Sequence, residues 1–281
     1  MTNLGTRILV AVVAIPIIIV VALLGSGYFF ALTTAIVILS LSEFYDLASR
    51  KGVMPSKILG MTAAGVLNAL VYSSGFNSAE VFLLLIIGIT LLSELFRARG
   101  ERVEKAFENV GVTLLGVFYI GIFGSTLTAI RERISIEAVF PDYLDSGVFI
   151  VVLFATIWIC DSAAYFAGKA IGQHKMSRLI SPNKTWEGAV AGLIFAILSA
   201  ASAKYLIMNH ISLAAAIGIG IIVGVLGQAG DFVESLFKRD AGQKDSSQLI
   251  PGHGGIFDRF DSLLFSAPFV YLWLVLISHV H

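Results

Sequence analysis

Apolar runs that are each close to the length of a membrane-spanning helix dominate this sequence. A helix that crosses the hydrocarbon core of a bilayer needs about 20 mostly apolar residues, with a range of roughly 17–25. Its backbone polar groups need partners inside the protein, and an α-helix supplies them within the segment itself. We therefore expect an all-α, polytopic integral membrane helix bundle with about nine transmembrane helices. The expected spans are residues 8–25, 27–42, 58–74, 80–95, 110–130, 148–169, 188–208, 211–234 and 262–279.

The composition excludes a soluble globular domain. Hydrophobic residues make up 57% of the chain and charged residues only 14%, against about 45–50% and about 25% in soluble domains. The formal net charge of zero offers no field to attract nucleic acid, so we expect no such partner. The single cysteine, Cys160, cannot form an internal disulfide. Arg7 and the first apolar run resemble a signal peptide, but a second run follows at once without a convincing cleavage site, so we expect the first span to be retained.

Basic residues collect in alternate loops, and this pattern predicts the orientation in the membrane. The loops between them hold few basic residues. By the positive-inside rule the N-terminus is cytoplasmic and the C-terminus is outside. The polar segments after the sixth and eighth spans then face the cytoplasm. The basic residues of the predicted cytoplasmic side are Arg7, Arg50, Lys51, Lys57, Arg97, Arg99, Arg102, Lys105, Lys169, Lys175, Arg178, Lys184, Lys238, Arg239, Lys244 and Arg259.

The chain shows no repeat of fixed period and no linker between soluble domains, which predicts a single integral membrane domain over residues 1–281. Residues 1–147 supply apolar spans and short loops, whereas residues 148–281 carry most of the polar chemistry. Pairs of glycines four residues apart favour close packing between helices, without any further role. These pairs are Gly168 with Gly172, Gly188 with Gly192, and Gly220 with Gly224.

Acidic residues occur inside two predicted spans, where an ionisable group is costly and usually marks a polar cavity. Asp161 lies within the sixth span, and Asp231 and Glu234 lie near the cytoplasmic end of the eighth. Helical spacing places Asp161 on one face with Lys169, and Asp231 with Glu234 and Lys238. Two facing helices would then line one cleft open to the cytoplasm. The alternative is that these acids only pair with the two lysines at the interface.

Residues 235–261, between the last two spans, hold the densest set of reactive side chains. Glycines within residues 251–255 allow the backbone to approach a ligand and offer amide donors to phosphate oxygens. Asp258 and Asp261 have the oxygen chemistry that Mg²⁺ prefers, although acids in a first helical turn also cap a helix. His253 has two open interpretations, as a phosphate donor or as a solvated turn residue. The basic residues of the segment are Lys238, Arg239, Lys244 and Arg259.

A second polar cluster follows the sixth span. Ser181 and Thr185 carry hydroxyls that bond phosphate or cap the next helix. Lys184 is a point charge suited to a polyphosphate, and Asn183 lies beside it. Taken with residues 235–261, this cluster predicts a phosphate and metal site at the cytoplasmic membrane surface.

Residues 235–261 resemble the sequence pattern of the phosphatidate cytidylyltransferases, also called CDP-diacylglycerol synthases. Residues 160–168 and 181–187 are similar to a second block of that family, and the blocks together cover about a fifth of the chain. The first five spans resemble the family only in being apolar. The matching residues of the longer block are Ser235, Lys238, Arg239, Lys244, Asp245, those at 251–255, Asp258, Arg259 and Asp261.

The resemblance implies a reaction of phospholipid biosynthesis, in which CTP and phosphatidic acid give CDP-diacylglycerol and pyrophosphate with Mg²⁺. The expected metal ligands for one or two divalent ions are Asp231, Asp258 and Asp261, with Asp161 nearby and an added monovalent cation left open. We expect Asp261 to be the principal ligand. The expected catalytic residues are Asp261, Asp258, Asp231 and Lys244, and the expected nucleotide and phosphate contacts are Ser181, Asn183, Lys184, Thr185, Lys238, Arg239, His253, Gly254, Gly255 and Arg259.

Two other functions remain open at this stage. A CTP-dependent lipid or polyprenol kinase would transfer the terminal phosphate and release CDP instead of pyrophosphate. An ion-coupled transporter would also place acids in the membrane, but such sites usually lie near the midplane between paired repeats, and no paired repeat is visible. The expected location is the inner, cytoplasmic membrane of a cell, with a multi-pass chain in the bilayer and the site facing the cytoplasm. A homodimer is one possible assembly.

Overall fold

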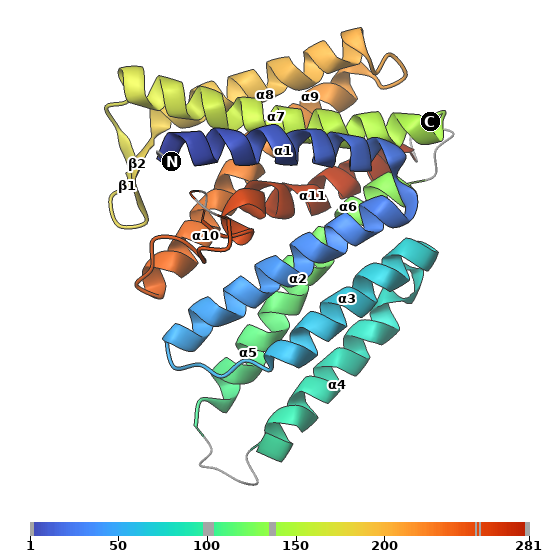
Figure 1. Cartoon of the computed structure of the whole chain (residues 1–281). Coiled ribbons are helices and arrows are strands. Elements are labelled where there is room, and N and C mark those ends of the chain that lie inside the picture. The colour runs from blue at the N-terminus through green and yellow to red at the C-terminus, as the bar shows by residue number, and fades with distance from the viewer. Residues whose placement is uncertain (1–2, 98–103, 135–138, 251, 253, 279–281) are drawn as a thin grey trace.

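A computed structural model describes residues 3–97, 104–134, 139–250, 252 and 254–278. These residues are almost entirely helical, with one short β-hairpin (Figure 1). The helices of the first half are α1 (Asn3–Leu24), α2 (Ser26–Arg50), α3 (Lys57–Ser74), α4 (Ala79–Arg97), α5 (Ala106–Gly116) and α6 (Phe123–Glu132). The second half contains α7 (Tyr143–Ile171), β1 (Lys175–Ser177), β2 (Ser181–Thr185), α8 (Trp186–Leu206), α9 (Leu213–Ile222), α10 (Gln228–Asp240) and α11 (Phe257–Ser278).

The predicted all-α membrane bundle is confirmed. In the described part of the chain, eight helical segments are long and apolar enough to cross a membrane, and the apolar part of α1, Ile8–Leu24, is shorter. Several predicted spans are longer than expected, including the second, which continues to Arg50, and two that join shorter helices into one. The span predicted at 110–130 covers Ala106–Glu132, and the one predicted at 211–234 covers Leu213–Asp240.

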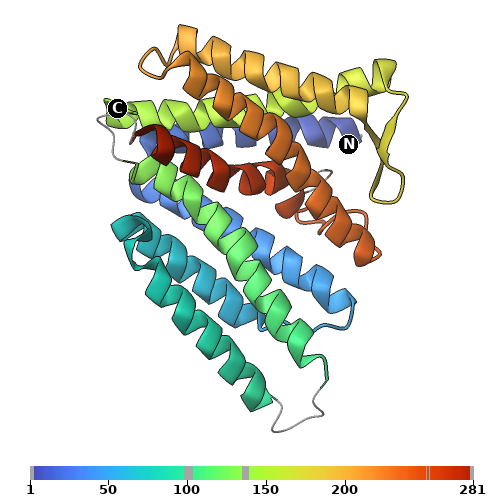
Figure 2. The same cartoon turned by 180° about the vertical axis from the view of Figure 1, so that it is seen from behind.

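Both joined spans contain a widened helical turn of the π type, and each continues through it as one rod (Figure 2). Val117–Ile122 joins α5 to α6, and Val223–Gly227 joins α9 to α10. Single turns of this kind occur frequently at functional sites. The second widened turn lies immediately before α10, which carries several of the polar residues predicted for the site.

Glycines allow the helices of the second half to pack closely, as their spacing predicted. A Cβ atom on Gly188 of α8 would lie 2.6 Å from the backbone oxygen of Ala164 in α7. A Cβ atom on Gly220 of α9 would lie 2.5 Å from Cα of Ile197 in α8. Backbone therefore packs against backbone along this layer, which places α7, α8 and α9 side by side (Figure 1).

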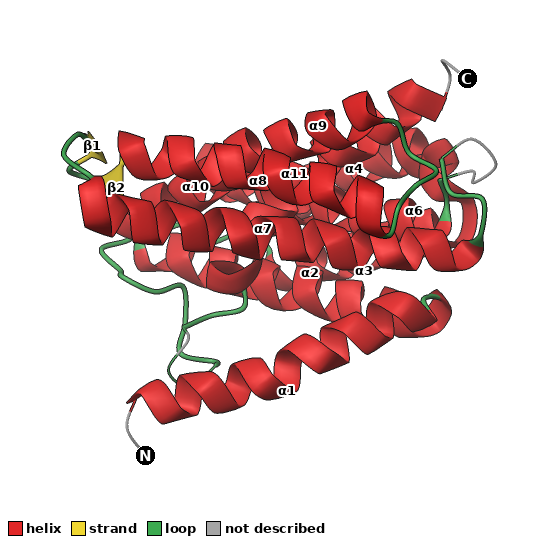
Figure 3. Cartoon of the chain, turned by 90° about the horizontal axis from the view of Figure 1, so that it is seen from above, coloured by secondary structure: helices red, strands yellow, loops and turns green. Residues whose placement is uncertain are grey.

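The start of α1 and the end of α11 lie at opposite ends of the bundle (Figures 1 and 3). The hairpin β1–β2 and the end of α10 lie at the same end as the start of α1 (Figure 1). Helix α1 runs along the edge of the bundle (Figure 3). Its far end is fixed by the fully buried Arg131 of α6, which donates hydrogen bonds to the backbone oxygens of Ala22 and Leu23 at 2.8 and 3.0 Å.

Candidate active site

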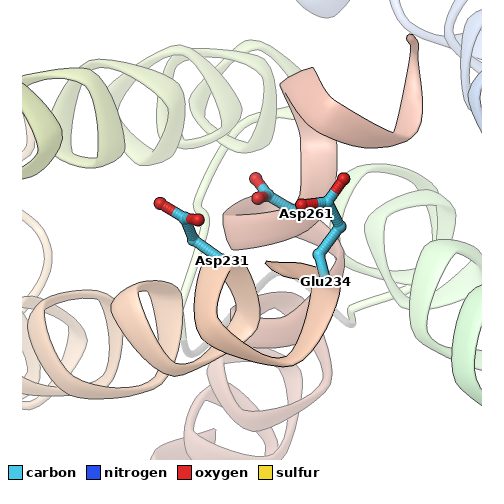
Figure 4. A group of neighbouring side chains, drawn as sticks. All are labelled: Asp231, Glu234 and Asp261. Carbon is cyan, nitrogen blue, oxygen red and sulfur yellow. The ribbon is translucent and has the colours of Figure 1, made fainter. Parts of the chain in front are cut away.

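Three carboxylates from two helices converge beside Lys184 of the hairpin (Figure 4). Asp231 and Glu234 lie on α10, and Asp261 lies in the first turns of α11. One oxygen from each residue lies within 4.8 Å of the others. The side chains point towards one another (Figure 4), and Glu234 and Asp261 are only 0% and 8% exposed. We call these three residues the acidic cluster.

The acidic cluster is only partly neutralised by the protein, because two lysines lie against its three carboxylates. Neither oxygen of Glu234 accepts a hydrogen bond of good geometry, although Oε2 lies 2.5 Å from Nζ of Lys238. Asp261 accepts a hydrogen bond from the backbone N–H of Ser262 at 2.6 Å. Because buried carboxylates are costly unless they are paired or coordinate a metal, the cluster is suited to a cation. Its oxygen ligands have the chemistry that Mg²⁺ prefers.

A lysine from the hairpin reaches the same cluster. Nζ of Lys184, in β2, lies 2.6 Å from Oδ2 of Asp231 and 4.3 Å from the centre of the Phe232 ring. Asp161 of α7 lies within electrostatic range of Asp231, Lys184 and Arg259. The structure thus brings together the sixth and eighth predicted spans and the loop after the sixth, as the helical spacing of the acids indicated.

Asp258 lies in a network of contacts beside the acidic cluster, and Lys238 joins the two. Oδ1 of Asp258 lies 2.6 Å from Nζ of Lys238, which therefore bridges Asp258 and Glu234. Oδ2 of Asp258 accepts hydrogen bonds from the backbone N–H groups of Ser246 and Gly255 at 2.9 and 2.8 Å. Both oxygens of Asp258 are thus engaged by protein donors, and Glu234, which was not predicted as a metal ligand, lies beside Asp231 and Asp261. The assignment of Asp258 as a metal ligand stays a prediction from the sequence.

Glu43 of α2 was missed by the sequence analysis. Its side chain is 5% exposed and accepts hydrogen bonds from the loop before α11 and from the start of that helix. The predicted second span ended at residue 42, so Glu43 was placed in a loop. One sequence signal could have identified Glu43. It is an acidic residue at the end of a long apolar run, and an ionisable residue at the membrane usually marks a polar site.

Besides Lys184, Lys238 and Gly255, whose contacts are given above, two residues predicted to bind phosphate have structural contacts. Thr185 accepts a hydrogen bond from the backbone N–H of Gly188 at 3.2 Å and so caps α8, the alternative left open from the sequence. Arg239 donates hydrogen bonds to the backbone oxygens of Ile180 and Gln243 at 3.3 and 2.8 Å. Arg239 thereby ties the hairpin to the end of α10.

Other predicted site residues differ in exposure. Asn183, Lys244 and Arg259 are exposed, and Ser181 is partly buried in β2. Gly254 has a φ angle of +85°, which favours glycine. A Cβ atom on Gly255 would lie 2.0 Å from Oγ of Ser246, so only glycine fits there. His253 lies outside the described residues.

Comparison with known proteins supports the chemistry that this geometry suggests. The model of the cytidylyltransferase family matches residues 5–277. The chain belongs to the cytidylyltransferase family. Among its relatives, a phosphatidate cytidylyltransferase of Synechocystis sp. is 33% identical over 297 residues, covering 98% of this chain and 97% of that protein. The phosphatidate cytidylyltransferase of Bacillus subtilis is 31% identical over 285 residues, covering 99% and 100%.

A relative from Staphylococcus haemolyticus, also a phosphatidate cytidylyltransferase, is 29% identical over 271 residues and covers 96% of this chain and 98% of its own. These alignments include the helices of the first half as well as the polar second half. A cytidylyltransferase acts on a nucleoside triphosphate, whose negative charge needs cations. The acidic cluster would hold a divalent cation, and the basic residues around it would add further positive charge.

Proposed function

We propose that this cytidylyltransferase transfers a cytidylyl group from CTP to phosphatidic acid, giving CDP-diacylglycerol and pyrophosphate. The observation that carries the proposal is the convergence of Asp231, Glu234 and Asp261 beside Lys184, at one end of a membrane bundle. The names of the relatives that align over nearly the whole chain support the two substrates. A membrane protein suits this reaction because one substrate is a lipid and the other is dissolved in water.

The reaction needs little covalent chemistry from the protein. An oxygen of the lipid phosphate attacks the α-phosphorus of CTP in line, and the bond from that phosphorus to the bridging oxygen of pyrophosphate breaks. A phosphate monoester has a second pKa of about 6, so the nucleophile is already largely ionised near neutral pH. No side chain is therefore required as a general base. Catalysis consists of holding the two phosphates in line and neutralising their charge.

The side chains divide into those that hold a cation and those that contact phosphate. Asp231, Glu234 and Asp261 would hold Mg²⁺, which supplies positive charge to the reacting phosphates. Lys184, which pairs with Asp231, and the exposed Lys244 would bind CTP phosphates. A second divalent ion, a monovalent cation and the contribution of Asp161 remain predictions from the sequence.

We place the site on the cytoplasmic side of the inner membrane. The basic loops of the sequence support this orientation, because positively charged loops are retained in the cytoplasm. CTP would enter from the water phase, while phosphatidic acid would reach the site from the bilayer. A homodimer remains a prediction from the sequence.

The proposal is tested with purified protein in detergent, phosphatidic acid, Mg²⁺ and each of the four nucleoside triphosphates in turn. We expect CTP to give pyrophosphate and a cytidylyl lipid in equal amounts. The other three nucleotides should give much less product. Release of CDP with a phosphorylated lipid would indicate a kinase and overturn the proposal.

A further inference from the structure

We propose that Glu43 is a positioning residue that fixes the loop between α10 and α11, which carries the predicted phosphate contacts Lys244, Gly254 and Gly255, against the start of α11. This inference rests on the proposed function, because it assigns Glu43 a role in binding CTP. Glu43 lies in the first half of the chain, more than 200 residues from its partners, with sequence separations of 203 to 214. It would make α2 part of the active site, although the catalytic motifs all lie in the second half.

The side chain of Glu43 is surrounded by hydrogen-bond donors. Oε1 accepts hydrogen bonds from Oγ of Ser247 at 2.6 Å and from the backbone N–H of Ile256 at 3.0 Å. Oε2 accepts from the backbone N–H of Phe257 at 2.8 Å and lies 2.8 Å from Oγ of Ser246. A carboxylate buried to this degree is stable only where such donors converge. The loop therefore cannot move without leaving the charge unsatisfied.

Glu43 also caps α11 from another helix. The first N–H groups of a helix have no partner within the helix, and a cap usually comes from a residue just before it. Here the N–H of Phe257, the first residue of α11, and that of Ile256 before it point to Glu43. The negative charge also lies at the positive end of the helix dipole. Glu43 thereby fixes the position of the helix that carries Asp258 and Asp261.

A chain of polar contacts leads from Glu43 to the acidic cluster. Oγ of Ser246 lies 2.8 Å from Oε2 of Glu43 and 2.8 Å from Oδ2 of Asp258. Asp258 contacts Lys238, and Lys238 contacts Glu234 of the acidic cluster. A hydroxyl has one hydrogen, so Ser246 donates to one of its two carboxylates at a time. Loss of the Glu43 charge would release Ser246 and shift the loop and Asp258 together.

The test replaces Glu43 with glutamine, which keeps the size of the side chain and removes its charge. The amide NH₂ would face donors instead of accepting from them, so the loop should lose its fixed position. We expect the KM for CTP to rise about tenfold, the size expected for lost hydrogen bonds to a charged group. The KM for phosphatidic acid should change by less than about twofold, because the proposal assigns the loop that Glu43 contacts to the nucleotide.

Asp46→Asn serves as the matched control. Asp46 lies on the same helix, one turn further along, and its ion pair with Lys57 at 2.8 Å is exposed to solvent. This variant should keep the wild-type KM for CTP. A second measurement follows the rise in melting temperature that CTP gives to each purified protein. Glu43→Gln should show a smaller rise than the wild type at equal CTP concentration, whereas Asp46→Asn should show the same rise.

Ser247→Ala tests the same contact from the other side and buries no new charge. We expect a severalfold rise in the KM for CTP, and the double variant with Glu43→Gln should show less than the product of the two single effects. An unchanged KM for CTP in Glu43→Gln, or equal rises for both substrates, would overturn the inference. If Glu43→Gln does not fold, an unchanged KM in Ser247→Ala would overturn it. Absence of CTP-dependent product in the wild type would instead contradict the proposed function.

Discussion

Removal of the Lys238 side chain tests how much this lysine stabilises the buried carboxylates of Glu234 and Asp258. Nζ of Lys238 lies 2.5 Å from Glu234 and 2.6 Å from Asp258, whose side chains are 0% and 4% exposed. Loss of one partner of a buried ion pair costs about 3–5 kcal/mol, because the other charge is left unpaired. In the Lys238→Met variant, the carboxylates of Glu234 and Asp258 would both lose this partner. We therefore expect the free energy of unfolding to fall by at least about 3 kcal/mol.

The assay is thermal unfolding in detergent without divalent cations. At roughly 2 °C for each kcal/mol in a chain of this size, the melting temperature should fall by roughly 6–10 °C. Lys51→Met is the matched control. Lys51 pairs at 2.9 Å with Asp240 of α10, the helix that also carries Lys238, and the two side chains are 45% and 64% exposed. Such an exposed pair contributes about 0–1 kcal/mol. Equal melting temperatures for the two variants would refute the reasoning.

Three further predictions follow from the same geometry. Asp261→Asn should lower Mg²⁺-dependent turnover by at least about 100-fold, because an acidic-cluster ligand is lost, and lipid product formation measures this. Lys184→Ala and Lys244→Ala should each raise the KM for CTP severalfold, and an unchanged KM in both would contradict their assignment to phosphate. Gly220→Ala should lower the melting temperature, since its Cβ would lie 2.5 Å from a backbone atom of α8, and overpacking costs about 1–3 kcal/mol. Gly88→Ala is the control. A Cβ atom on Gly88 would have no neighbouring atom within 4 Å outside its own helix, so the melting temperature should not change.

The transmembrane helices were predictable because hydrophobicity is a property of each segment alone. The errors occurred where a helix continues past its apolar stretch. The span predicted to end at residue 234 continues to Asp240, because Lys238 and Arg239 form polar contacts that keep the last turns helical. Likewise, the second span continues past residue 42 to Arg50. Hydropathy predicts where a segment leaves the hydrocarbon core of the membrane. The helix itself can continue further, and its end depends on the local contacts of its last turn.

The site was predictable where several polar residues share one segment. Asp231 and Glu234 were identified from their depth in an apolar run, and Asp261 from its place in the dense segment. The approach of Glu234 to Asp231 and Asp261 was not predictable, because it depends on how α10 and α11 pack. Glu43 was missed for the same reason. Its partners are distant in sequence, and no local pattern identifies which loop an isolated acid will contact.

Transfer of labelled phosphorus tests the central claim most directly. Purified protein would receive phosphatidic acid, Mg²⁺ and CTP labelled at either the α- or the γ-phosphorus. We predict that the lipid product carries the α label and that the γ label leaves in pyrophosphate, with both signals lost in Asp261→Asn. Appearance of the γ label in the lipid would show phosphoryl transfer instead, and would contradict the assignment of this chain as a cytidylyl transferase acting on phosphatidic acid.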